Sequence, residues 1–397
     1  MIETESALQE FIAIAQRAKV VGLDTEFVGE GRYRTLLCLI QLAAPHPRAR
    51  NGSPRTLIEL IDPLSGALDL SPLGRLLADP QVQVITHAGR QDVALLRRAL
   101  STEVNGLFDT QLAAGFLGLP AQRSYEGLLS EVLSVQLRKS ASFTRWEARP
   151  LTEEQLSYAK EDVEHLIALA HALQDRLRSV GRLQWALQEC EAIARASDER
   201  DLQAVFTRLP RIASLSRQAQ ALAHALVHWR EDTAAAADRP VQSVLSDAAL
   251  LEIARRAPRT AQELAKIRGV QHSLVRRCGE QIVQAIAQAR SRGQLPPLPL
   301  QRSVPTHPSD ASLVALSEAL ARDRARQSGL AYELVTSRAE LQAIVAAKRL
   351  REPEPAVRPL RGWRRQLLGE ELLRLLDGEL ALSVAEGQLQ VRPPAAS

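Results

Sequence analysis

An acidic pair at the end of an apolar run constrains this chain more than any other feature. Residues 19–27 read KVVGLDTEF, so hydrophobic residues lead directly to Asp24 and Glu26. Residues i and i+2 of a strand point to the same face, which places both carboxylates side by side at the end of a buried strand. Two such anions repel each other and resist desolvation. The pattern predicts a cation between them if other parts of the chain bring more carboxylates to the same place.

The composition limits the class of protein. A chain of 397 residues with 45% hydrophobic and 24% charged residues is typical of a soluble protein of two to three domains. Cys38, Cys190 and Cys278 form no CxxC pair, so we expect neither a zinc site nor disulfides, and a reducing, cytoplasmic setting. We expect no membrane span, because no apolar stretch reaches about 18 residues. The first ten residues carry three glutamates, which is not typical of a signal peptide.

The first half of the chain has the pattern of an α/β domain. We expect an amphipathic helix over 5–17 and apolar strands over 19–27, 35–43, 56–62, 82–86 and 104–109. Three strands with short connections, followed by strands that alternate with helices, predict a mixed sheet flanked by helices.

From about residue 200 the sequence predicts helices and no strand. Two helical blocks, 206–292 and 310–385, are separated by a Pro-rich segment, 293–309, and followed by a tail, 386–397. The Pro-rich segment is expected to act as an extended spacer. VQSVLSDAALLEIARR in the first block is similar to YELVTSRAELQAIVAAKR, which follows about 90 residues later in the second, so we infer a duplicated helical domain.

Three further aspartates supply the carboxylates that the acidic pair requires. Asp92 opens the helix after the fourth strand, in HAGRQD, and Asp109 ends the fifth strand. Asp162 follows Tyr158 by one helical turn, so the two side chains share a face. Taken singly, Asp92, Tyr158 and Asp162 have ordinary structural explanations. Asp92 can be a charge at a helix start, Tyr158 a core residue, and Asp162 part of a solvated face. Their joint order favours a common site.

That order, Asp-x-Glu, His-x4-Asp and Tyr-x3-Asp, resembles the tyrosine subclass of the DEDD exonuclease superfamily, and within it the ribonuclease D family. Residues 139–166 are similar to the signature that leads to the family's last aspartate. The helical blocks resemble HRDC (helicase and ribonuclease D C-terminal) domains, notably at residues 229–231 and 362–364. The resemblance covers nearly the whole chain. Arg138 and Arg145 stand where the family usually has aspartate, which puts the substrate preference in doubt.

The resemblance implies a ribonuclease H-like exonuclease domain over 1–205 and two all-α HRDC-like domains. It implies 3′→5′ hydrolysis of RNA with release of 5′-mononucleotides, in trimming the 3′ ends of tRNA precursors and other structured RNAs. The family's catalytic positions correspond to Asp24, Glu26, Asp92, Tyr158 and Asp162. The four carboxylates are hard ligands suited to two Mg²⁺ or Mn²⁺ ions. A phenol with a pKa near 10 is a poor base, so the tyrosine is expected to position water.

Several other residues are expected to support the site or to contact RNA. His87 and Asp109 are predicted behind the metal ligands, with a strand-end turn as an equal alternative for Asp109. The predicted RNA contacts combine basic and aromatic side chains: Lys139, Trp146, Arg149, Arg361, Trp363 and Arg364. A core tryptophan on an arginine-rich solvated surface is the alternative for the last three. His224 and His228 share a helical face, but with no third ligand nearby in the sequence we expect a structural role.

Two other functions remain open. One is a DNA 3′–5′ exonuclease of the proofreading or repair type with the same metal site, and the other is a nucleic-acid-binding protein whose nuclease site is vestigial. A contact to the 2′-hydroxyl would separate RNA from DNA, and no single sequence reveals it. We expect a monomeric, cytoplasmic, bacterial protein with RNA as its partner.

Overall fold

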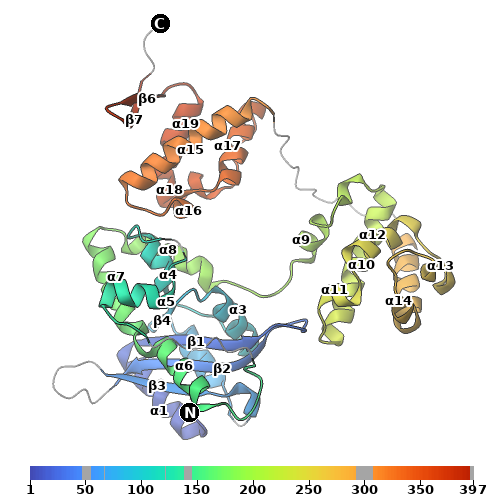
Figure 1. Cartoon of the computed structure of the whole chain (residues 1–397), viewed down its shortest axis with the longest axis horizontal. Helices are drawn as coiled ribbons and strands as arrows, with labels where there is room; N and C mark the ends of the chain where they lie inside the picture. The colour runs from blue at the N-terminus through green and yellow to red at the C-terminus, as the bar shows by residue number, and fades with distance from the viewer. Residues whose placement is uncertain (47–54, 67, 121, 138–144, 292–306, 394–397) are drawn as a thin grey trace. The chain divides into compact units, whose positions relative to one another are not determined.

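The computed structural model describes residues 1–46, 55–66, 68–120, 122–137, 145–291 and 307–393. The chain divides into two compact units (Figure 1). The first comprises residues 1–26, 37–197 and 304–397, and the second comprises residues 27–36 and 198–303. Arg138, Lys139 and most of the expected 293–309 spacer lie outside the described residues. Within the described ranges, no helix is both long and apolar enough to cross a bilayer.

A five-stranded sheet is the centre of the first unit. Its order is β3-β2-β1-β4-β5, in which β3 lies antiparallel to β2, and β1, β4 and β5 run parallel. The strands span Val20–Val28, Leu36–Pro45, Thr56–Ile61, Gln83–Thr86 and Leu107–Asp109, for β1 to β5 in turn. Eight consecutive residues of β2 are buried, as expected for a strand covered on both faces. The predicted mixed sheet is confirmed, with each strand within three residues of its expected position.

Helices cover this sheet, and one of them approaches its central strand closely. α1 begins after Thr4, whose side chain accepts a hydrogen bond from the Ala7 main chain. α7 approaches β1 closely at Gly22, where an added Cβ would lie 3.4 Å from an Ile167 side-chain carbon. The helices of this part are α1 (Glu5–Ala18), α2 (Ser71–Ala78), α3 (Arg90–Ala99), α4 (Thr110–Gly115), α5 (Tyr125–Leu128), α6 (Glu153–Glu164), α7 (Leu166–Ser179) and α8 (Leu183–Ala194).

The second helical block belongs to the same unit as the sheet. It comprises α15 (Asp310–Gln327), α16 (Tyr332–Val335), α17 (Arg338–Leu350), α18 (Gly362–Arg364) and α19 (Glu370–Leu376). An antiparallel hairpin of β6 (Ala381–Ala385) and β7 (Gln388–Arg392) follows. The expectation of helices alone and of a tail from 386 is therefore wrong. Glu386 and Gly387 have positive φ angles of 54° and 73°, the turn geometry that joins two such strands.

A buried ion pair joins the second helical block to the sheet domain. The Trp363 ring stacks on Trp185, with centroids 5.0 Å apart and planes 11° apart. Both Arg364 terminal nitrogens donate to Glu189, at 2.5 and 2.8 Å. Trp363 and Arg364 are each only 5% exposed, so the expectation that they contact RNA is corrected: the structure encloses both in an interface between two parts of the chain.

The second unit is helical, as expected for the first block. Its helices are α9 (Leu202–Thr207), α10 (Arg217–Ala236), α11 (Val241–Val244), α12 (Asp247–Arg256), α13 (Ala261–Ala265) and α14 (His272–Ser291). Arg230 is 1% exposed and donates to the Leu245 carbonyl and to Asp247. A long helix, a one-turn helix and a helix capped by serine follow one another in both blocks, with Ser246 and Ser337 as the caps. This shared order is consistent with duplication.

The Glu189–Arg364 pair generates a stability prediction. Glu189→Ala leaves an enclosed guanidinium without its carboxylate and should lower the free energy of unfolding by about 2 kcal/mol. Glu191→Ala is the matched control on the same helix, because its carboxylate is mostly exposed and its ion pair among the described residues is a surface one with Arg195. Urea unfolding of the whole chain measures both. Equal midpoints for the two variants would contradict the interface.

Candidate active site

The carboxyl ends of three parallel strands meet at one edge of the sheet. Gly22 of β1 pairs with Ile85 of β4, so Asp24 comes just beyond the last pair, where β4 also ends. Thr86 of β4 pairs in turn with Asp109 of β5. The sheet register therefore brings the acidic end of β1 next to the chain that leaves β4 and next to Asp109.

Asp109 holds the turn that places Asp92. Its carboxylate accepts hydrogen bonds from the Gly89 main chain at 2.7 Å and from the Leu112 main chain at 2.9 Å. Gly89 is required in this turn, since an added Cβ would lie 2.4 Å from the Thr86 side chain. The turn delivers Asp92 into the first helical turn of α3, where Asp92 is 7% exposed.

His87 lies against Thr110 and Tyr125. Its Nδ1 lies 3.0 Å from the Thr110 hydroxyl, and its ring centroid lies 5.5 Å from that of Tyr125. No hydrogen bond joins the ring to Asp109 among the described residues. Asp109 acts on the main chain of the turn, and His87 packs beside it.

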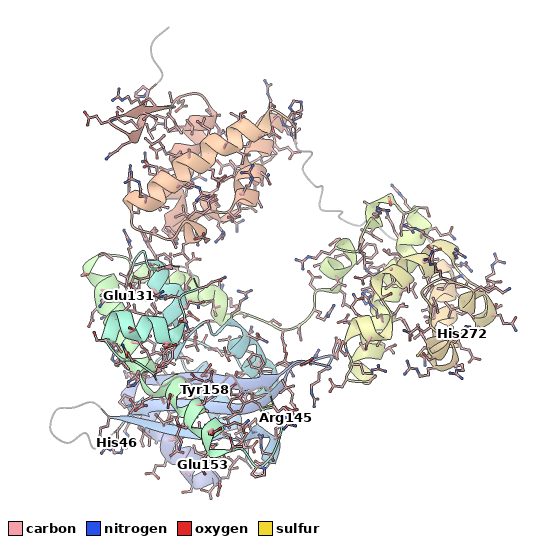
Figure 2. All side chains as sticks on the ribbon, in the orientation of Figure 1. His46, Glu131, Arg145, Glu153, Tyr158 and His272 are labelled. Atoms are coloured by element: carbon pink, nitrogen blue, oxygen red, sulfur yellow. The ribbon has the colours of Figure 1, made fainter. Side chains whose placement is uncertain are left out.

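Helix α6 brings the remaining predicted residues to the site. Thr152 and Gln155 form a reciprocal capping box that fixes where the helix begins. Tyr158 and Asp162 then share one face, and the Tyr158 hydroxyl donates a hydrogen bond to the Asp162 carboxylate. Tyr158 is labelled on α6 in Figure 2.

The four predicted ligands act on one another electrostatically. Burial and the charges of Asp92 and Asp162 raise the pKa of Asp24 well above its ordinary value. Burial, followed by the charges of the same two aspartates, raises the pKa of Glu26 to about 8. Burial also raises the pKa of Asp162 to about 7, although the Tyr158 hydroxyl opposes this shift. The structure thus gathers the four carboxylates into one desolvated cluster.

Thr25 supports this cluster, although no motif in the sequence pointed to it. Its hydroxyl donates a hydrogen bond to Asp92, and both side chains are buried. This bond lowers the pKa of Asp92, whereas burial, the larger effect, raises it. Thr25 lies between the two acidic residues of β1, and a hydroxyl residue at that position is the one signal that the sequence offered.

Two phenols border the cluster and stay protonated. Burial and the charge of Asp162 raise the pKa of Tyr158 above its ordinary value. The same two causes raise the pKa of Tyr125, which the sequence analysis also did not identify. Neutral phenols donate hydrogen bonds and do not take up protons, so neither side chain is suited to act as a base.

The donor set fits a hard divalent cation by its chemistry. Carboxylate oxygens are the ligands that Mg²⁺ and Mn²⁺ prefer, and a cation would offset the repulsion that raises these pKa values. Within the described ranges, no three His, Cys, Asp or Glu side chains already converge on one point as a closed metal site requires. Asp24, Glu26, Asp92 and Asp162 are the residues that would hold such a cation.

Two of the predicted RNA contacts, Trp146 and Arg149, make contacts within the chain near the site. Trp146 is 3% exposed, and its ring centroid lies 6.1 Å from that of Tyr158. Arg149 donates to Asp62 at 2.6 Å and to the Cys38 carbonyl at 2.8 Å, which ties the segment before α6 to the sheet. The expectation of RNA contact is corrected for Trp146, which is buried. Arg149 and Arg361 are exposed, so contact with RNA stays a prediction for both.

Comparisons with known proteins agree with this arrangement. Residues 1–178 match the model of a 3′–5′ exonuclease family, and residues 219–286 match the HRDC domain model. Ribonuclease D of Gluconacetobacter diazotrophicus is 35% identical over all of this chain and 97% of its own length. That of Granulibacter bethesdensis is 34% identical over 98% of this chain and 96% of its own length. The crystal structure of Escherichia coli RNase D, an exoribonuclease involved in structured RNA processing, superposes with a TM-score of 0.79 at 28% identity, covering 95% of this chain and 98% of that one.

The Thr25 hydrogen bond generates an activity prediction. Thr25→Val keeps the side-chain shape and removes the hydroxyl that orients Asp92, so the rate of RNA hydrolysis should fall about 10-fold to 100-fold. Thr102→Val is the control, because the Thr102 hydroxyl bonds the Gly74 carbonyl, away from the carboxylates. Initial rates on single-stranded RNA measure both. Unchanged activity in Thr25→Val would show that Asp92 needs no such support.

The raised carboxyl pKa values generate a pH prediction. In the unfolded chain these groups titrate near pH 4, whereas Glu26 and Asp162 titrate at about 8 and about 7 in the folded protein. The folded state therefore binds more protons between these values, so the metal-free protein loses stability as pH rises from about 4 to about 8. Melting temperatures in EDTA should fall across this range, and fall less in Glu26→Gln. Added Mg²⁺ should raise the melting temperature most at pH 8. A melting temperature that Mg²⁺ does not change at any pH would contradict the carboxylate cluster.

Proposed function

The chain belongs to the ribonuclease D family and is a 3′–5′ exoribonuclease, and we propose that it hydrolyses RNA with two divalent ions, Mg²⁺ or Mn²⁺, held by Asp24, Glu26, Asp92 and Asp162. The product is a 5′-mononucleotide, released one at a time from the 3′ end. One observation carries the proposal: these four side chains form a desolvated cluster in which the charges of Asp92 and Asp162 add to burial in raising the pKa of Asp24 and Glu26. Folding alone disfavours such a cluster, and a bound cation stabilises it.

The metal ions, when bound, would supply an activated water and would stabilise charge on the attacking and leaving oxygens. The residues of the chain provide the frame for this chemistry. β1 and α6 present carboxylates from two sides, while the turn held by Asp109 and the Thr25 hydroxyl fix Asp92. The carboxylates must lose their protons before they hold a cation, so activity requires a pH at which metal displaces those protons.

Tyr158 is proposed to orient the attacking water. Its hydroxyl stays protonated beside Asp162, so it offers a hydrogen bond without removing a proton. Trp146 packs near its ring and limits where the phenol can lie. Tyr158→Phe should therefore reduce the rate and leave metal binding in place, whereas loss of a carboxylate should reduce both.

The natural substrates are proposed to be tRNA precursors and other structured RNAs with unpaired 3′ ends. The E. coli relative is described as acting in structured RNA processing, which supports this class. We further propose that the second helical block is a second HRDC-like domain, because it repeats the helix order of the block that matches the HRDC model. A monomer that acts in the cytoplasm completes the proposal.

Degradation of 5′-labelled single-stranded RNA and matched DNA tests this function. With Mg²⁺, RNA should shorten stepwise from the 3′ end, and EDTA or Asp162→Asn should reduce the rate by at least about 1,000-fold. Glu153→Gln is the matched control, since Glu153 is an exposed carboxylate in the first turn of the same helix and lies outside the proposed set. Equal cutting of DNA would support the proofreading-type alternative. RNA binding without cutting in either metal would support the vestigial site.

A further inference from the structure

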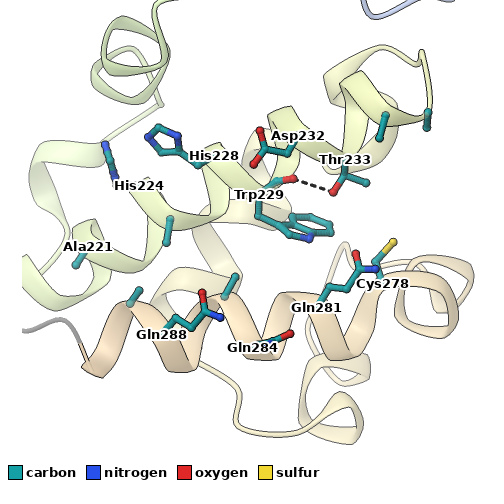
Figure 3. A pocket seen from close by; sticks show the side chains of 15 residues that line it. Ala221, His224, His228, Trp229, Asp232, Thr233, Cys278, Gln281, Gln284 and Gln288 are labelled. Carbon is teal, nitrogen blue, oxygen red and sulfur yellow. Dashed lines mark hydrogen bonds between the residues drawn. The ribbon is translucent and has the colours of Figure 1, made fainter.

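A groove of about 960 Å³ lies between α10 and α14, within the domain that matches the HRDC model (Figure 3). It contains none of the proposed metal ligands, and the proposed nuclease mechanism does not use it. Cavities of this size hold ligands as large as a nucleotide.

Helix α10 gives the groove flat rings and one carboxylate. His224, His228 and Asp232 follow one another at intervals of four residues and line the same wall. The two imidazole centroids lie 4.6 Å apart with planes tilted by 56°. Burial, followed by the neighbouring His228, lowers the pKa of His224, which favours its neutral ring. This wall offers faces on which another planar ring can stack.

Trp229 adds an unused donor. Its indole lies between α10 and α14 (Figure 3), and its N–H is buried without a hydrogen-bond partner among the described residues. A buried donor without an acceptor costs about 1–3 kcal/mol, and native proteins keep few of them. A ligand oxygen or ring nitrogen that reached this N–H would remove that cost.

Helix α14 gives the opposite wall a row of amides. Gln281, Gln284 and Gln288 are exposed and lie on one helical face. None of the three side-chain amides forms a hydrogen bond with another described residue, so their donors and acceptors are available. Arg277 continues this face one turn before Gln281.

We propose that this groove binds an unpaired nucleobase of the RNA, and this inference rests on the proposed exoribonuclease function. The rings of α10 offer stacking surfaces, while the amides, Asp232 and the indole N–H match the mixed donors and acceptors of a base edge. Arg277 is placed to contact a phosphate of the same strand. A paired base keeps its edge and faces inside the duplex, so the groove selects single-stranded RNA.

A protein helix is a poorer occupant of this groove. An apolar helix laid against it would bury the three amides and the Asp232 carboxylate without partners and would leave the indole N–H unsatisfied. Each such group costs about 1–3 kcal/mol, and a charged one costs more. A base satisfies these groups and stacks on the rings at the same time.

Binding measurements with the full chain test this inference. Every protein tested carries Asp162→Asn, which prevents degradation of the RNA. The two probes are a single-stranded RNA and an RNA of equal length from which the internal bases are removed. Base stacking contributes about 1–3 kcal/mol per base, so the base-containing RNA should bind at least about 5-fold more tightly. Gln281→Ala with Gln284→Ala should remove most of this preference. Trp229→Phe, which keeps a ring and removes the N–H, should reduce it about 2-fold to 10-fold.

Gln262→Ala is the matched control, because Gln262 is an exposed glutamine on α13 of the same unit and does not line the groove. It should keep the full base preference. The inference would be overturned if the protein with an unaltered groove bound both probes equally. It would also be overturned if the double variant kept the full preference for base-containing RNA. Either result would leave the groove to a protein partner. These measurements use no cleavage, so the absence of cutting by the unsubstituted protein would refute the proposed function without deciding the role of the groove.

Discussion

Repulsion among four desolvated carboxylates is the constraint on which the site depends. Burial raises the pKa of Asp24, Glu26 and Asp162, and the charges of Asp92 and Asp162 raise the first two further, so the metal-free protein holds protons that exposed carboxylates would have lost at neutral pH. Such a cluster persists only because strong local structure holds its members in place. β1 is buried between helices, and α6 starts at a reciprocal cap. The stability of the fold therefore opposes the repulsion at its catalytic edge.

Residues that surround the cluster also hold the local structure of the site in place. Asp109, although acidic, accepts main-chain hydrogen bonds from Gly89 and Leu112 and so fixes the chain on both sides of the site. Arg149 and Trp146, although basic and aromatic, tie down the segment before α6. Residues that resemble binding groups in sequence thus stabilise the frame, and the exposed groups of the α10–α14 groove are the better candidates for contact with bases.

Local patterns made much of this structure predictable. The strand at 19–27 and the helix after Thr152 follow from apolar runs and caps, and the sheet register then brings Asp24 next to the turn before Asp92. Long-range burial was not predictable: nothing near Trp363 in sequence reveals that Glu189 and Trp185 enclose it. The C-terminal hairpin was missed because its short strands follow a helix and are only partly buried.

The central claim is that a divalent cation replaces protons on this cluster. Calorimetric titration of Mn²⁺ at pH 6.5, in buffers of different ionisation enthalpy, counts the protons released as the metal binds. Because Glu26 and Asp162 have pKa values of about 8 and about 7, binding should release on the order of one proton or more per chain, and fewer in Glu26→Gln. Metal binding with no proton release, or equal release from Glu26→Gln, would contradict the claim.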